Sequence, residues 1–198
     1  MATPPDFTTG QVLTAAQMNA VGLWRVTGCT VSSVGGTAAT ASNGVVTTGV
    51  GNTSVTVSNA FSADFKNYKV LFTFGTTSAG GRLNLQLNAA TGTSYFTVAT
   101  YLAYGTATNL ALATTGGGET SFYAADTNTG GFGASFELHN PFVSTTKTFI
   151  TGSWLSNGLA GTFGGVQNTN VSHTGFTIST ATGNINSNFE IRVYGYND

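Results

Sequence analysis

Charge is the scarcest feature of this 198-residue sequence. Only 7% of the residues are Asp, Glu, Lys or Arg, against about 25% in an average soluble domain. The six cationic residues are scattered singly, and the formal net charge is −1. Binding to nucleic acid requires clustered Lys and Arg, so we expect no nucleic-acid partner.

Cysteine and long apolar runs are also rare. Cys29 is the only cysteine, which excludes an intrachain disulfide and a zinc site built from several cysteines. The residues around it indicate a strand, so we expect a small buried side chain rather than a reactive thiol. No apolar run approaches the roughly 18 residues of a membrane helix, and the N-terminus lacks the regions of a signal peptide. We therefore expect a soluble protein with no membrane partner.

The residues that are present favour β-structure. Thr, Ser, Asn, Val and Gly make up whole segments, a mixture typical of strands and turns. Leu83, Leu85 and Leu87 alternate with polar residues, which predicts a strand with one apolar face. Similar alternation places Tyr68, Val70, Phe72 and Phe74 on one face and predicts another strand in 189–196, and further strands are predicted at 24–32, 54–61, 95–101, 133–139, 147–155 and 175–179. Without helices to connect them, these strands predict an all-β fold, an antiparallel two-sheet sandwich of jelly-roll type.

The first 24 residues differ from the rest because they contain the only helix pattern. Thr14 is a suitable N-cap, Gln17 completes a capping box, and Gly22 is a stop. A helix of about eight residues is unstable alone, so it must dock onto another surface. We therefore divide the chain into an N-terminal docking segment with a short helix, residues 1–24, and a β-sandwich domain, residues 25–198.

No motif in the sequence points to catalysis. The seven acidic residues are far apart, and the glycine clusters at 116–118 and 130–133 lack the pattern of a nucleotide-binding loop, so we expect turns there. His139 and His173 lack metal-ligand spacing, and we expect His139 at a strand end and His173 exposed in a loop. The prediction is a protein that is not an enzyme and has no cofactor and no metal.

Tyrosines are the candidate contacts with a receptor or another subunit. A tyrosine on an outer face can stack on a sugar ring or anchor an interface. The alternative, open for each residue, is a half-buried ring that covers a sheet edge. The candidates are Tyr101, Tyr104, Tyr194 and Tyr196.

The scarcity of charge also bears on self-association. Charged side chains are one device against edge-to-edge pairing of sheets. A chain with so few of them would be protected by burial of its edges in a homo-oligomer, although polar Thr and Ser faces are a sufficient alternative.

Several short motifs together resemble a known family. The N-terminal PPDF (4–7) and GQVLTAAQMN (10–19) are similar to the start of many tail-fibre and minor structural proteins of tailed bacteriophages. The order of FSADFKNYKV (61–70), NPF (140–142), KTF (147–149), GFTI (175–178) and IRVYGY (191–196) resembles the β-rich domain of phage appendage proteins. The resemblance covers most of the chain.

The resemblance implies a virion component, assembled in the host bacterial cytoplasm and commonly trimeric. Its partners would be other copies of itself, a tail or major capsid protein, and a host surface glycan. The N-terminal segment would dock to the particle through Pro5, Phe7, Val12, Leu13, Met18 and Trp24.

Three functions follow from these patterns. No long shaft separates the predicted helix from the strands, which disfavours a long fibre and leaves the first two. The first is a short tail appendage that attaches to a host receptor. The second is a capsid decoration protein that stabilises the head. The third, a polysaccharide-degrading enzyme, is disfavoured by the absence of an acidic cluster or metal motif in the sequence.

Overall fold

The computed structural model describes residues 22–90, 92–105, 109–186 and 189–197, with the backbone alone for 109–118. This part of the chain forms fifteen β-strands and no helix. The strands are β1 (Trp24–Arg25), β2 (Thr30–Val34), β3 (Thr40–Ser42), β4 (Val45–Thr47), β5 (Ser54–Ser58), β6 (Asn67–Gly75), β7 (Gly81–Leu87), β8 (Tyr95–Ala103), β9 (Asn109–Glu119), β10 (Phe122–Thr127), β11 (Phe132–His139), β12 (Thr148–Ser156), β13 (Leu159–Gln167), β14 (Phe176–Thr180) and β15 (Glu190–Tyr196).

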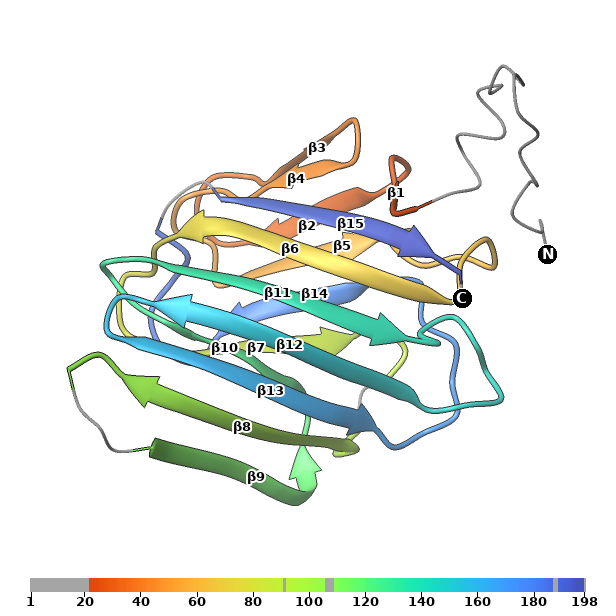
Figure 1. The fold of residues 1–198 in the computed structure, drawn as a ribbon. Helices are drawn as coiled ribbons and strands as arrows, with labels where there is room; N and C mark the ends of the chain where they lie inside the picture. Colours follow the sequence, from red (N-terminus) through yellow and green to blue (C-terminus); the bar gives the residue numbers. More distant parts are fainter. Residues whose placement is uncertain (1–21, 91, 106–108, 187–188, 198) are drawn as a thin grey trace, which may run out of the picture.

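The strands form two antiparallel sheets that stack face to face (Figure 1). The large sheet has ten strands in the order β3-β4-β15-β6-β11-β12-β13-β8-β9, with β1 also paired to β15. The small sheet has five strands in the order β10-β7-β14-β5-β2. The predicted all-β, antiparallel two-sheet sandwich is therefore confirmed. The predicted N-terminal helix lies outside the described residues, and none of the described segments forms a helix that could span a bilayer.

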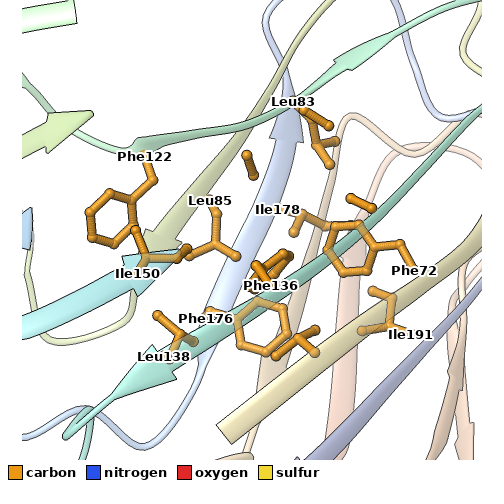
Figure 2. Close-up of a cluster of buried hydrophobic side chains, with 14 of the residues drawn as sticks. Phe72, Leu83, Leu85, Phe122, Phe136, Leu138, Ile150, Phe176, Ile178 and Ile191 are labelled. Atoms are coloured by element: carbon orange, nitrogen blue, oxygen red, sulfur yellow. The ribbon is translucent and has the colours of Figure 1, made fainter. Parts of the chain in front are cut away.

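The core lies between the sheets and is built from the alternating apolar positions of both (Figure 2). Leu83, Leu85 and Leu87 of β7 are fully buried, which confirms their predicted inward face. Burying a side chain of this size stabilises the fold by about 2–3 kcal/mol. Across from the small sheet, the rings of Phe72 and Phe136 meet edge to face with centroids 5.3 Å apart.

One predicted inward residue points outward. Phe74 was expected to share a face with Phe72, but its side chain is 61% exposed. The pairing of β6 with β11 shifts register at this point, so that Gly75, not Phe74, lies opposite Phe132. A β-bulge of this kind inserts one extra residue and reverses the face of those that follow it.

Other differences concern strand boundaries and turns. The single strand expected over 24–32 is two strands, and Cys29 lies in the segment between them. The glycines at 116–118, expected to form a turn, lie within β9, which was not predicted as a strand. The strands β3, β4, β10 and β13 were not predicted either. Cys29 is buried, as expected, and burial raises the pKa of its thiol to about 11.

Candidate interaction surface

Exposed apolar side chains gather on one surface of the molecule, the side of the large sheet that faces away from the small sheet. We call this surface the outer face, defined by the outward residues of β15, β6, β11, β12, β13 and β8 and by Tyr104, which directly follows β8. Nine large hydrophobic side chains in the described part of the chain are exposed, and six of them lie on this face. This concentration makes the outer face the candidate interaction surface. The six are Phe74, Val98, Leu102, Tyr104, Phe149 and Leu155.

Two hollows in this face lie on either side of Leu155. One has a volume of about 500 Å³ and is lined on the β6 side by Leu71 and Phe74. The other, of about 620 Å³, is lined on the β8 side by Leu102 and Tyr104. Leu155 lines both and is 48% exposed. The apolar side chain of Leu155 therefore separates two depressions in the outer face.

Small hydroxyl side chains lie between the apolar residues. Ser135 and Ser153 face each other across β11 and β12, and Thr162 continues the same row on β13. Ser153 lines both apolar hollows and a third, polar hollow of about 310 Å³. Side chains this short would let another protein surface approach the sheet closely.

The charged side chains of the outer face are paired with one another. Lys69 Nζ lies 3.6 Å from Glu137 Oε1, and the Tyr196 hydroxyl donates a hydrogen bond of 3.1 Å to Glu137 Oε2. Arg192 forms an ion pair with Glu190 two residues earlier in β15. Half-exposed ion pairs of this kind add little to stability. With two cations and two anions, these strands carry no net charge.

The structure places all four predicted tyrosines on the large sheet but in two locations. Tyr104 is 60% exposed and lines the second hollow, together with Tyr101. Tyr101 is partly buried, because its ring packs against that of Trp154, with the two ring centroids 5.9 Å apart. Tyr194 and Tyr196 are half-buried on β15, at the opposite side of the face. Only Tyr101 and Tyr104 are brought together.

The sequence prediction missed the aliphatic and phenylalanine part of this surface. Phe149 and Leu155 lie in a predicted strand whose inward residues include Ile150 and Trp154. Large apolar residues at both the inward and the outward positions of one strand indicate burial on both faces of the sheet. That pattern was available in the sequence.

Most of the predicted docking residues cannot be placed. Pro5, Phe7, Val12, Leu13 and Met18 lie outside the described residues. Trp24 lies in β1, half-buried, and pairs with Gly195 of β15.

His173 differs from its predicted position, since it is fully buried rather than exposed. Its backbone N–H donates to the Pro141 carbonyl at 2.8 Å, and its Nδ1 accepts a hydrogen bond of 3.3 Å from the Ala89 N–H. Three loops are thereby joined at one end of the sandwich, and burial lowers the pKa of the His173 ring to about 4. The prediction failed because a polar loop sequence does not reveal that the loop folds back onto its neighbours. His139, by contrast, ends β11 as predicted.

The remaining titratable groups with shifted pKa values do not form a cluster with His173. Asp126 lies on β10, where burial raises the pKa of its carboxyl and the Ser156 hydroxyl donates to it at 3.4 Å. Within the described ranges, no three His, Cys, Asp or Glu side chains group in a way that could hold a metal ion. What the described surface offers most clearly is apolar contact.

Comparison with known proteins identifies no relative: no family model, curated protein or solved structure matches this chain significantly.

Proposed function

We propose that this protein is a structural component of a tailed-bacteriophage particle, a short tail appendage that docks through its N-terminal segment and presents the β-sandwich for attachment to a host receptor. The observation that carries the proposal is the apolar, charge-paired outer face, which suits assembly with other protein surfaces. The N-terminal and body motifs that resemble phage appendage proteins support it. The proposed partners are further copies of the chain, in a homotrimer as the resemblance implies, a tail or capsid protein, and a receptor such as a surface glycan.

The strand order adds support from the fold. We infer that the sandwich is a jelly roll, with β5-β14-β7-β10 as one four-stranded layer and β6, β11, β8 and β9 as the other. The hairpin β12–β13 is then an insertion between β11 and β8. Jelly rolls are common in viral capsid and lectin domains, so this architecture suits both particle assembly and receptor binding.

A capsid decoration protein is the second candidate, favoured by the position of β1. This strand begins at Trp24, directly after the predicted helix, and pairs with β15. No shaft therefore separates the predicted docking helix from the sandwich, as a protein seated close to a capsid surface would require. A polysaccharide-degrading enzyme is the third and least supported candidate.

The location and copy number of the protein in purified particles distinguish these functions. Electron microscopy combined with quantitative mass spectrometry should find a few to a few dozen copies at the tail if the protein is an appendage. Hundreds of copies over the head would establish decoration instead. Absence from particles would refute both, and turnover of a host polysaccharide by the purified protein would revive the enzyme.

A deletion tests the docking role of the N-terminal segment. Removing residues 1–21 keeps β1 and its pairing with β15. We expect this variant to fold, with the circular-dichroism spectrum of a β-protein, and to be absent from particles. Loss of folding would show that the segment belongs to the core, and normal incorporation would show that docking uses another surface.

A further inference from the structure

We infer that the outer face of the large sheet is a self-association surface that binds a second copy of this chain. The inference rests on the proposed function for its premise that this face makes protein contacts, and it adds which of the proposed partners this face binds. Three properties of the face support the inference: its size, its charge and its surface shape.

The size of the face matches what a stable protein pair requires. Six strands at about 4.8 Å each span about 29 Å, and the nine residues of β12 at about 3.3 Å each span about 30 Å. The product is about 850 Å², close to the roughly 800 Å² per partner of a standard interface. Contact over the whole face would therefore suffice without help from another surface.

The charge of the face favours a copy of itself over a charged partner. On the six strands that form it, the two cations and two anions, Lys69, Arg192, Glu137 and Glu190, are engaged in ion pairs within the chain. An acidic glycan or a charged protein would find no unpaired charge there to neutralise. Two copies of a neutral face meet without the repulsion that opposes association of like charges.

The surface shape of the outer face is complementary to that of a second copy. Leu155 stands between hollows of about 500 and 620 Å³ that are lined mainly by apolar residues. Leu155 of one copy can seat in a hollow of another, reciprocally in a pair that uses the whole face or successively in a ring that divides the face between two neighbours. Burying this side chain, now 48% exposed, removes apolar surface from water in each copy.

Analytical ultracentrifugation of the full-length purified protein tests the inference. We expect a mass of two or three times the 20.2 kDa chain at tens of micromolar. Leu155→Asp and Leu102→Asp should each weaken association at least tenfold, because both residues point outward and their charge would be buried at the contact. The matched control is Val34→Asp, which places the same charge at a 63% exposed valine on β2 of the small sheet.

Each outcome of these measurements either supports or overturns the inference. Oligomers that dissociate in both leucine variants but persist in Val34→Asp, with all three variants folded by circular dichroism, support the inference. A monomeric wild-type protein at 100 µM, or oligomers unaffected by either leucine variant, would overturn it. So would an equal loss of association in Val34→Asp. None of these results depends on where the protein lies in the particle, so failure of this inference and failure of the proposed function remain distinguishable.

Discussion

The burial of His173 predicts a specific loss of stability in acid. Its Nδ1 accepts the Ala89 N–H, so the neutral ring carries its proton on Nε2, which has no hydrogen-bond partner among the described residues. A second proton would have to displace the Ala89 hydrogen bond and place a charge in a fully buried site. The folded protein therefore holds the ring neutral down to a pKa of about 4, whereas the unfolded chain protonates it near 6.5.

The sign and size of the effect follow from proton linkage. Between pH 6.5 and about 4 the unfolded state binds one more proton at this site than the folded state, so the free energy of unfolding falls as the pH falls. A pKa difference of about 2.5 units corresponds to a loss of about 3 kcal/mol, complete near pH 4. Asp126 opposes this loss. The pKa of its carboxyl is raised in the folded state, so just above pH 3.8 the folded state binds more protons there than the unfolded state. This contribution raises the free energy of unfolding as the pH falls.

Urea denaturation at a series of pH values from 7 to 4 measures this loss. His173→Gln keeps an acceptor for the Ala89 N–H but cannot be protonated, so its loss of stability over this range should be about 3 kcal/mol smaller than that of the wild type. His139→Gln retains His173 and should therefore retain the loss of stability that His173 causes. Parallel pH profiles for the wild type and His173→Gln would refute the linkage argument.

Three further predictions concern the core. Leu85→Asp should prevent folding, because it places a carboxylate at a fully buried position; a wild-type circular-dichroism spectrum and melting temperature would contradict this. Gly161→Ala should destabilise the protein by about 1–3 kcal/mol in thermal unfolding, since its Cβ would lie 2.7 Å from the Thr100 carbonyl oxygen. Gly92→Ala, whose Cβ meets nothing within 4 Å, should have little effect. Cys29, buried and with a pKa of about 11, should react slowly with a thiol reagent at pH 8 in the native state and rapidly in urea; rapid native labelling would show that it is accessible.

Alternation of apolar residues was sufficient to predict most of the core. In β7 the period of two held over the whole strand, and Leu83, Leu85 and Leu87 all point inward. In β6 it held as far as Phe72 and failed at Phe74, where the ladder with β11 contains a bulge. A bulge is defined by two strands together, so one strand's sequence does not reveal it.

The strands that were missed include glycine-rich ones, and packing explains why they are strands. Glycine is disfavoured in isolated strands, yet β13 contains Gly161, Gly164 and Gly165. A Cβ on Gly161 would meet the Trp154 ring at 2.8 Å, and one on Gly165 would meet the Phe122 ring at 3.1 Å. Gly161 and Gly165 make room for large rings in the core between the sheets. A rule applied strand by strand cannot anticipate this, because each ring comes from another strand.

The outer face could be predicted only in part, because its strands do not alternate apolar and polar residues. An antiparallel sheet with one face in water usually alternates apolar and polar residues, as β7 does. In β12 the inward Ile150 and Trp154 are matched by the outward Phe149 and Leu155, and in β8 the outward Val98 and Leu102 break the alternation in the same way. Both strands lie inside the large sheet rather than at its edge, so edge protection does not account for these residues. The small sheet covers the inward side chains of β12. A second protein surface over the outward side chains would bury them in the same way.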